Sequence, residues 1–428
     1  MFSEIFNIEK NNTVVITGAG GKTSLLFTLG EELSQKGRVL ITTTTKIYRP
    51  EAEKYEELII GNSHFAGEGK NITVAVSDEK DNKLISLSYD EIEKIKKDFD
   101  YILIEGDGAK EKLLKKWNDS EPCIPPFTDK IIGILNCDIL GMEVSEKNIH
   151  RFHLLEKEFS QYINKKIDSS FLAEYLNSAD YFKGAAASVR KYLFFNGIDG
   201  ERELDKFSFA LDTINKTTKR DYAIIMGSIK KREAYSYQKV DAVVMASGFS
   251  KRMGSNKLKL EIDGISLLEK TLQRLAALPF KEVLVCGREE WVKVLAEKYG
   301  FKYLLNSLAH LGQSESIKLG VKNCKGKGVV FFTGDQPFLT EKTILTLYIN
   351  FLKRNLITIP TVSEKRFSPV FFPDEKKSEL LKLEGDTGGR IVIKNTPVIN
   401  LVDFPSDKEF ADIDTEEDYM YMLENNRI

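Results

Sequence analysis

Disulfide-forming and metal-binding side chains are scarce in this sequence. It holds four histidines and four cysteines, and the cysteines stand far apart with no Cys-x-x-Cys pair, at Cys123, Cys137, Cys286 and Cys324. This pattern excludes a disulfide scaffold and a cysteine zinc site. We therefore interpret the cysteines as buried or incidental thiols in a reducing compartment.

Long apolar runs are also missing. The longest, such as Val39–Ile41 and Val329–Phe332, have the length of a strand, whereas a helix that crosses a bilayer needs about 20 apolar residues. The first residues, MFSEIFNIEKNN, carry acids where a signal peptide would carry bases. We expect a cytoplasmic protein that makes no membrane contact.

No single sign of charge dominates. The 62 basic side chains nearly offset the 64 acidic ones, and the formal net charge is −2. A nucleic-acid-binding protein usually shows a broad basic footprint, so we expect no nucleic acid partner. Any phosphate must be bound by local groups.

What the sequence does contain is enough apolar material for more than one core. A chain of 428 residues with 42% hydrophobic residues predicts two or three domains. Short β-branched runs alternate with amphipathic segments such as Lys22–Lys36, which is typical of α/β proteins with mostly parallel sheets. The predicted strands are Thr13–Thr17, Val39–Thr42, Tyr101–Glu105, Ile131–Leu135, Tyr192–Phe195, Tyr222–Met226, Val240–Met245, Glu282–Cys286, Val329–Thr333, Ile357–Thr361, Val370–Phe372 and Val398–Leu401.

A domain boundary is expected near residues 233–240. The polar stretch Gly227–Lys239 follows one predicted strand, and a new strand, Val240–Met245, begins directly after it. We therefore predict one domain over residues 1–235 and a second over residues 240–428.

A loop of small residues follows the first strand of the second domain. It runs from Met245 to Gly254, and Arg252 and Lys257 lie within it and just beyond it. Small residues let main-chain amides approach a triphosphate closely, and the two cations supply positive charge. The alternative is a surface turn with incidental basic residues.

An aspartate ends a second apolar strand of this domain. Asp335 follows Thr333, at the carboxyl edge where open α/β sheets place their ligands, and a carboxylate there suits Mg²⁺ bound to phosphates. The alternative is that Asp335 only caps the helix that starts near Glu341. Asp414 belongs to a later acidic run, a pattern that is also common at solvated helix starts.

Polar residues near two other strand ends are candidates for substrate contacts. Asn306 and Ser314 suit hydrogen bonds to a base or ribose, although Ser314 is equally interpreted as a helix N-cap. Gly385, Asp386 and Arg390 form a second glycine-rich loop, where Arg390 suits an acceptor phosphate.

In this order, these motifs resemble the molybdenum cofactor cytidylyltransferase family, which has a MobA-like nucleotidyltransferase fold. The resemblance covers nearly all of residues 240–428 and implies a Rossmann-like domain that joins CMP from CTP to molybdopterin or Mo-molybdopterin with Mg²⁺. Ser247 departs from the Ala-Ala-Gly of the family and from the Gly-Gly of GTP-using relatives, and Ser368 stands where Gly or His is expected before Pro369. A sugar or polyol phosphate is the alternative acceptor.

The resemblance assigns roles to individual residues. It implies catalytic roles for Arg252, Lys257 and Asp335, and metal ligation by Asp335 and Asp414. The implied nucleotide-binding residues are Met245, Ala246, Ser247, Gly248, Ser250, Gly254, Asn306 and Ser314, and the implied acceptor-binding residues are Gly385, Asp386 and Arg390.

The first domain also opens with a strand, a glycine loop and a helix. Loop amides and a helix N-terminus suit a phosphate, and an acid at a nearby strand end commonly orients Mg²⁺ or water. The alternative is a glycine turn that binds no phosphate. The predicted nucleotide-binding residues are Gly18, Gly20, Gly21, Lys22, Thr23, Ser24, Glu105 and Asp107.

Together with Thr42–Lys46 and His150-Arg151, these residues resemble the selenium-dependent hydroxylase accessory protein family over residues 1 to about 235. The resemblance implies a P-loop-like domain that binds ATP or GTP and a molybdenum hydroxylase as client. A nucleotide switch or metallochaperone without catalysis is the alternative. The spacing of His150 and His153 places them on one helical face, where packing is favoured over a metal site.

Overall fold

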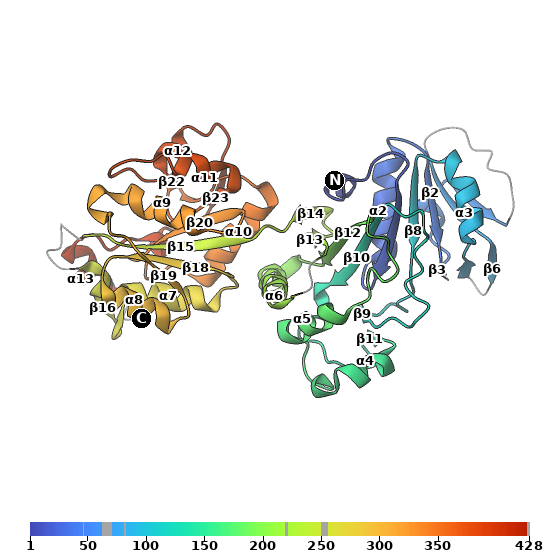
Figure 1. The fold of residues 1–428 in the computed structure, drawn as a ribbon, viewed down its shortest axis with the longest axis horizontal. Coiled ribbons are helices and arrows are strands. Elements are labelled where there is room, and N and C mark those ends of the chain that lie inside the picture. The colour runs from blue at the N-terminus through green and yellow to red at the C-terminus, as the bar shows by residue number, and fades with distance from the viewer. Residues whose placement is uncertain (46, 62–70, 81–82, 219–220, 250–255, 426–428) are drawn as a thin grey trace. The chain divides into compact units, whose positions relative to one another are not determined.

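The structure is a computed structural model that describes residues 1–45, 47–61, 71–80, 83–218, 221–249 and 256–425. The chain divides into two compact units, Met1–Tyr237 and Gln238–Ile428. Figure 1 shows that each unit is built on its own sheet. None of the helices described has both the length and the apolar character needed to span a bilayer.

The first unit contains a nine-stranded sheet in the order β14-β13-β12-β10-β1-β8-β2-β5-β4. All neighbouring strands are parallel except β13 and β14. Its strands are β1 (Thr13–Gly18), β2 (Val39–Thr43), β4 (Glu57–Ile60), β5 (Ile72–Val76), β8 (Tyr101–Glu105), β10 (Lys130–Asn136), β12 (Arg190–Asn196), β13 (Ala223–Ser228) and β14 (Glu233–Ser236).

Smaller elements complete this unit. The short strands β3 (Ile47–Tyr48), β6 (Asp78–Lys80) and β7 (Lys83–Ile85) form one small sheet, and β9 (Leu114–Lys115) pairs with β11 (Ile149–His150). The helices are α1 (Phe2–Ile5), α2 (Lys22–Ser34), α3 (Tyr89–Ile95), α4 (Phe152–Glu158), α5 (Ser169–Ser178) and α6 (Glu203–Lys216).

The two faces of this sheet carry separate apolar cores. Val14 and Ile16 of β1 pack with the leucines of α2, including Leu25 and Leu29, in one core. Val15, which points to the other face, packs in a second core near α3. Because side chains alternate along a strand, a central strand covered on both faces is apolar throughout. The sequence pattern of β1 follows from that position.

The second unit contains a sheet in the order β19-β18-β15-β20-β23-β21-β22, with β24 paired to β21. Strands β19, β18, β15 and β20 are parallel, and β23 is antiparallel to both of its neighbours. The strands are β15 (Val240–Ala246), β18 (Val283–Gly287), β19 (Lys302–Leu305), β20 (Gly328–Thr333), β21 (Thr358–Val362), β22 (Lys365–Arg366), β23 (Val370–Pro373) and β24 (Asn400–Asp403).

The helices of this unit cover both faces of its sheet (Figure 1). Residues of α9, α11 and α12 share one buried core with β15 and β20. Gly320 of α9 lets the helix approach β15 closely, because a Cβ there would lie 2.7 Å from Val243. The helices are α7 (Leu267–Ala277), α8 (Glu290–Lys298), α9 (Gln313–Asn323), α10 (Glu341–Arg354), α11 (Lys377–Leu380), α12 (Arg390–Lys394) and α13 (Glu416–Asn425), and β16 (Glu261–Ile262) pairs with β17 (Ile265–Ser266).

The predicted α/β class with mostly parallel sheets is confirmed. Each predicted strand overlaps an observed one, and α2 begins at the expected Lys22. Five strands of the two main sheets, β4, β5, β14, β19 and β22, were not predicted. The division between Tyr237 and Gln238 lies within the 233–240 stretch where a boundary was expected.

Candidate functional site

In the second unit, the loop after β15 and the acid after β20 emerge at the same edge of the sheet. The two strands are parallel neighbours, and Met245 pairs with Thr333 at their carboxyl ends. The chain therefore brings the small-residue loop and the segment that carries Asp335 together. This edge is where open α/β sheets bind ligands.

Lys257 joins two carboxylates at this edge. Its Nζ lies 2.5 Å from Asp335 Oδ2 and 2.7 Å from Asp414 Oδ1. Burial alone would lower the pKa of Lys257, but the two carboxylates outweigh it and raise the pKa. Asp335 is 8% exposed, and its Oδ1 has no hydrogen-bond partner among the described residues. The two carboxylates thus share one cation and leave a buried oxygen available.

The segment that carries Asp414 is fixed to the end of β20. The amide of Ile413 donates to the carbonyl of Asp335 at 3.2 Å, and Gln336 Nε2 donates to the carbonyl of Phe410 at 3.0 Å. Gln336 is buried. The sequence analysis gave it no role, although its place beside Asp335 could have suggested one.

A third carboxylate, Asp412, lies beside the pair. Desolvation by the surrounding protein raises its pKa to about 7, and the negative charges of Asp335 and Asp414 add to this shift. Its side chain nevertheless reaches solvent. The three carboxylates therefore repel one another unless a cation or a proton is present.

These residues fit a hard divalent cation. Carboxylate oxygens are the protein ligands that Mg²⁺ prefers, and one or two of them are usually completed by phosphate oxygens and water. Asp335 and Asp414 supply such a pair. Oδ1 of Asp335, which has no hydrogen-bond partner among the described residues, is suited to ligate the ion. Within the described residues, no group of three or more His, Cys, Asp or Glu side chains could hold a metal ion.

Two of the alternative interpretations are wrong. Helix α10 is capped by Thr340, whose side chain accepts from the Thr343 amide, so Asp335 is not its cap. Helix α9 has Gly312 at its N-cap, so Ser314 is not a cap either. Ser314 is fully buried, and its hydroxyl has no hydrogen-bond partner among the described residues.

Ser247 and Asn306 belong to a small buried network. The Ser247 hydroxyl donates to the carbonyl of Cys286 at 2.9 Å, and Asn306 Nδ2 donates to Ser247 Oγ at 3.3 Å and to Ser316 Oγ at 3.0 Å. Asn306 Oδ1 accepts from the Leu308 amide. These contacts brace the start of the small-residue loop, and a direct contact of either side chain with a base stays a prediction.

The two glycine-containing loops meet at Gly312 and Gly385. A Cβ on Gly312, which has φ 120°, would lie 2.4 Å from the carbonyl carbon and oxygen of Gly385. Asp386 Oδ1 accepts from the Gln313 amide at the start of α9. Gly385 and Asp386 thus support this helix start, and their contact with an acceptor stays a prediction.

A cleft of about 1540 Å³ in this unit brings several predicted residues together. Drug-sized ligands usually occupy about 300–1,000 Å³, so the space exceeds that of one small ligand. The predicted site residues that line it are Met245, Asp386, Arg390 and Asp414. Three others, Ser250, Arg252 and Gly254, lie outside the described residues.

In the first unit, the turn between β1 and α2 is held by two asparagines. Asn136 and Asn196, each the last residue of its strand, donate through Nδ2 to the carbonyl of Gly20, both at 3.0 Å. Gly21 has φ 141°, and a Cβ there would lie 2.7 Å from Asn196 Nδ2. Neither asparagine was predicted here, although the carboxyl-edge rule for parallel strands could have identified both.

Lys22 lies at the start of α2 and turns back to the loop. Its Nζ donates to the carbonyl of Gly18 at 2.8 Å and lies 3.4 Å from Asp107 Oδ1 and 3.7 Å from Glu105 Oε1. Thr23 Oγ1 donates to Glu105 Oε2 at 2.9 Å. Burial raises the pKa of Glu105 despite the opposing charge of Lys22. The predicted Lys22, Thr23, Glu105 and Asp107 are therefore neighbours.

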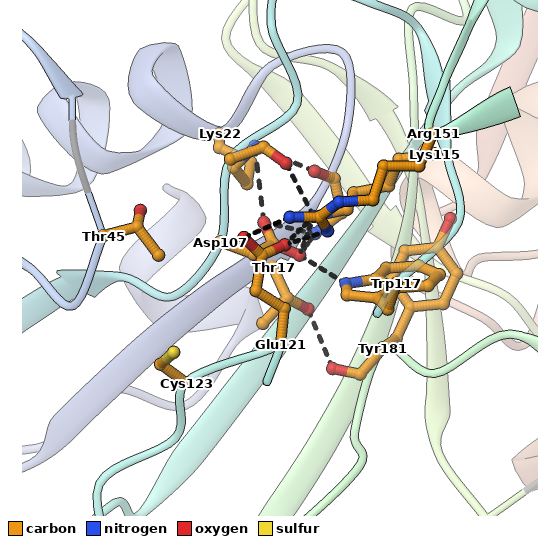
Figure 2. A network of polar contacts seen from close by, with 12 residues as sticks. Thr17, Lys22, Thr45, Asp107, Lys115, Trp117, Glu121, Cys123, Arg151 and Tyr181 are labelled. Atoms are coloured by element: carbon orange, nitrogen blue, oxygen red, sulfur yellow. Dashed lines mark hydrogen bonds and ion pairs between the residues drawn. The ribbon is translucent and has the colours of Figure 1, made fainter. Parts of the chain in front are cut away.

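Asp107 is the centre of this network (Figure 2). Its two oxygens accept from the Gly18 amide at 3.1 and 3.0 Å, and Oδ2 accepts from Trp117 Nε1 at 2.6 Å. Lys115 Nζ lies 3.1 Å from the same Oδ2. Asp107 and Lys115 are fully buried. Ser24, by contrast, is exposed on the first turn of α2.

A second carboxylate extends the network to Arg151. Glu121 accepts from Arg151 at 2.6 and 2.8 Å and from Lys115 at 2.8 Å (Figure 2). Burial would raise the pKa of Glu121, but the hydrogen bonds and charges of Arg151 and Lys115 outweigh it and lower the pKa to about 2. Lys115 and Glu121 were not predicted, because neither belongs to a motif with a recognisable spacing.

The expected helical face of His150 and His153 is not formed. His150 ends β11, Arg151 follows with φ 56°, and α4 begins at Phe152. A left-handed residue between the two histidines breaks the helical spacing. Burial, together with the nearby charges of Arg151 and Lys115, lowers the pKa of His150 to about 4.

Two family models match separate parts of the chain. Residues 14–153 match the family described as YqeC protein, and residues 242–399 match the MobA-like NTP transferase domain. The first region is 34% identical over 154 residues to the protein YqeC of Escherichia coli (strain K12), covering 34% of this chain and 59% of that protein.

The second region is similar to proteins with several names. It is 27% identical over 134 residues to a protein of Natranaerobius thermophilus named as a molybdenum cofactor guanylyltransferase, covering 31% of this chain and 64% of that protein. It is 26% identical over 191 residues to the purine catabolism protein PucB of Bacillus subtilis (strain 168), covering 41% of this chain and 92% of PucB. The chain thus spans less than two thirds of the Escherichia coli and Natranaerobius relatives.

Solved structures also match the chain. One is molybdopterin-guanine dinucleotide biosynthesis protein A from Archaeoglobus fulgidus, with 19% identity, a TM-score of 0.36, and coverage of 43% of this chain and 97% of that one. Both resemblances inferred from the sequence are confirmed at the level of these families. Residues 14–153 are therefore similar to the YqeC protein family, and residues 242–399 are similar to the MobA-like NTP transferase domain.

Proposed function

We propose that the second unit transfers a nucleoside monophosphate from a nucleoside triphosphate to the phosphate of a small acceptor and releases pyrophosphate. The specific reaction that we propose is transfer of CMP from CTP to molybdopterin or Mo-molybdopterin. The observation that carries the proposal is the Lys257 ammonium held between Asp335 and Asp414, directly after the small-residue loop. A cation-binding carboxylate pair beside a phosphate loop is the arrangement that phosphoryl chemistry requires.

The protein contributes alignment and neutralisation of charge. An oxygen of the acceptor phosphate attacks the α-phosphorus of the triphosphate, the bond from that phosphorus to the bridging oxygen breaks, and pyrophosphate leaves. Amides of the loop that begins at Ala246 hold the phosphates, and Lys257 and Arg252 offset their charge. Ser247 and Asn306 keep the loop in place through their buried network.

Asp335 and Asp414 are the residues that would hold Mg²⁺. The ion supplies charge neutralisation at the phosphates when it is bound. Lys257 pairs with both of these carboxylates. With Mg²⁺ held by the carboxylates, the Lys257 ammonium would offset charge on the phosphates.

The base of the nucleoside triphosphate has two candidates, cytosine and guanine. CTP is our prediction from the motif Gly334-Asp335-Gln336-Pro337, which resembles the cytidylyl branch. GTP is the second candidate, because the Natranaerobius relative and one from Aquifex aeolicus (strain VF5) are named as guanylyltransferases. Ser247 matches neither branch, and its hydroxyl bonds to the carbonyl of Cys286.

Pyrophosphate release tests the proposal. The protein is incubated with CTP, GTP or UTP and with molybdopterin, Mo-molybdopterin, a sugar phosphate or a polyol phosphate, in the presence of Mg²⁺. We expect release with CTP and a molybdopterin acceptor. Pyrophosphate release with GTP in place of CTP would assign guanine as the base. Pyrophosphate release only with a sugar phosphate or a polyol phosphate would refute the molybdopterin assignment.

We infer that the first unit binds a nucleoside triphosphate, ATP or GTP, in a P-loop-like site. The loop amides of Gly20 and Gly21, the start of α2 and Lys22 form an anion-binding arrangement, and Thr23 with Glu105 offers oxygens for Mg²⁺. A client molybdenum hydroxylase, selenium-dependent or not, is the partner that we propose for this unit.

The Lys22→Ala variant separates a hydrolase from a switch. Loss of rapid, unstimulated hydrolysis in Lys22→Ala would establish an NTPase. Tight nucleotide binding without hydrolysis, together with co-purification of a hydroxylase, would instead support a switch or metallochaperone. A wild-type protein that binds neither ATP nor GTP would refute the nucleotide site itself.

A further inference from the structure

The cleft of the second unit carries its basic side chains on two elements. Lys365 and Arg366 form β22, and Arg390 and Lys394 are the ends of α12. All four side chains are exposed, and all four line the cleft. The carboxylates Asp412, Asp414 and Asp418 line it from a different segment, 412–418. These four cations and these three carboxylates therefore line one cavity from different segments of the chain.

Within the part of the chain that the structure describes, no carboxylate neutralises these four cations. Among the residues that the structure describes, none of them forms an ion pair, whereas Lys376 and Lys377 nearby pair with Glu379 and Asp374. Arg390 and Lys394 are four residues apart in α12, where like charges destabilise a helix. Uncompensated positive charge on two elements of one cleft is expected when the counter-charge comes from a ligand.

Other charged residues of the cleft do not supply that counter-charge. Asp386 is engaged at the start of α9, where it accepts from the Gln313 amide. Lys408 also lines the cleft, but Asp407 directly precedes it and lines the cleft too. We therefore leave Lys408 out of the basic set.

An aromatic ring lies beside the cations. Phe367 lines the cleft, and Lys365 Nζ lies 5.0 Å from the centroid of its ring. The ring stacks on buried Phe410 with centroids 5.2 Å apart. Phe410 precedes the carboxylate segment, so Phe367 contacts both a basic residue of β22 and a residue just before that segment.

We propose that Lys365, Arg366, Arg390 and Lys394 form a basic subsite that binds a second anionic group of the acceptor, distinct from the phosphate that reacts near Asp335. The proposal rests on the proposed function and narrows its acceptor class. The acceptor is a phosphate monoester that carries another anionic group, such as a carboxylate, a thiolate or an oxyanion. A neutral sugar or polyol phosphate lacks that group.

Two phosphate monoesters of similar size test the basic subsite by binding alone. 3-Phosphoglycerate carries a carboxylate that glycerol 3-phosphate lacks. Isothermal titration is performed on the full chain with Mg²⁺ and saturating α,β-methylene analogues of CTP and GTP, which fill the nucleotide site. We expect 3-phosphoglycerate to bind about tenfold more tightly, the ordinary effect of one charge-assisted hydrogen bond.

Double variants that replace the cations by glutamine test whether these side chains cause the tighter binding of 3-phosphoglycerate. In Lys365→Gln/Arg366→Gln and in Arg390→Gln/Lys394→Gln, the preference for 3-phosphoglycerate should fall to about twofold or less. The matched control is Lys342→Gln/Arg354→Gln, which also removes one lysine and one arginine, but from exposed positions on α10 that do not line the cleft. The control should keep the wild-type preference.

Three results would overturn the subsite: equal affinity of wild type for the two esters, no measurable binding of either, or a preference that both cleft variants retain. Failure of the proposed reaction is recognised separately. Absence of pyrophosphate release with every acceptor refutes the transferase, whereas the titration compares affinities without any turnover.

Discussion

At the scale of single residues, the account of the second unit depends on three side chains. Lys257, Asp335 and Asp414 come from distant positions in the chain and meet at one edge of the sheet. Two acids around one ammonium leave the cluster negatively charged overall, and Asp412 adds to that charge. A divalent ion would offset this negative charge and leave positive charge for the phosphates of a substrate.

Removal of the Asp335 carboxylate should reduce turnover with little effect on the fold. We expect Asp335→Ala to lose ~10²–10³ in pyrophosphate release, the usual effect of deleting one electrostatic stabiliser. The matched control is Glu297→Ala, an exposed acid on α8, which should retain wild-type turnover. Near-normal turnover of Asp335→Ala, with an unchanged circular dichroism spectrum, would exclude Asp335 from the mechanism.

Asp412 should make stability depend on pH. Its pKa is about 7 in the folded chain, above the ordinary 3.8, so the folded state holds the proton more tightly than the unfolded chain. Stability should therefore fall as pH rises from about 4 to about 7, and change little above that range. Asp412→Asn cannot ionise and escapes this loss.

The Asp412 effect is measured as a difference in melting temperature with EDTA present. Between pH 4 and pH 8, the melting temperature of Asp412→Asn relative to wild type should rise by about 1–3 °C, a range reduced because the side chain is partly exposed. Addition of Mg²⁺ should shrink the difference. A difference that is constant with pH would contradict the raised pKa.

Among the charged side chains of the first unit, Asp107 should cause the largest loss of stability when its charge is removed. Asp107→Asn preserves the shape but leaves Lys115 and Lys22 with less counter-charge in a buried place. Breaking such a buried pair destabilises by about 3–5 kcal/mol. Calorimetry should show a clear loss for Asp107→Asn and less than about 1 kcal/mol for the control Asp119→Asn, whose pair with Lys183 is exposed. Equal effects would refute the central role of Asp107.

At the scale of elements, strands were more predictable than contacts. Strands such as β1 and β20 are buried on both faces, so their apolar runs identify them from the sequence. The carboxyl-edge rule then places Glu105 and Asp335 correctly at strand ends. Strand β4 was missed, because it is short and only Ile59 of its four residues is buried.

The rest of the site could not be predicted because it depends on tertiary contacts. Lys115 and Glu121 lie in segments without a motif. Lys115 pairs with Asp107, and Glu121 pairs with Lys115, only through contacts made in the folded chain. Likewise, no local pattern indicates that Asn306 braces Ser247, 59 residues away. The left-handed backbone conformation of Arg151 also prevents His150 and His153 from lying on one helical face, as was expected.

The contact between the two glycine-containing loops has its own test. Gly312→Ala would place a Cβ 2.4 Å from the backbone of Gly385, in a backbone conformation that side chains rarely adopt. Gly300→Ala is the matched control, because Gly300 also has a positive φ but meets nothing within 4 Å. Gly312→Ala should be less stable than Gly300→Ala by about 1–3 kcal/mol in urea unfolding. Equal stabilities would show that the loops can separate freely.

At the scale of the whole molecule, the chain carries two different arrangements that we propose to bind phosphate. The first unit uses a helix start with Lys22, and the second uses a loop with Lys257, and in each an ammonium pairs with carboxylates at a strand end. Each unit has its own apolar cores. Variants in one unit should therefore leave ligand binding by the other unchanged.

The central claim is that Asp335 and Asp414 hold a divalent ion together with the triphosphate. Electron paramagnetic resonance counts the Mn²⁺ ions bound by the full chain in the presence of α,β-methylene-CTP or its GTP counterpart. The account predicts that Asp335→Ala/Asp414→Ala binds one ion fewer than wild type, while Lys22→Ala retains that ion. An unchanged number and affinity of ions in the double variant would contradict it.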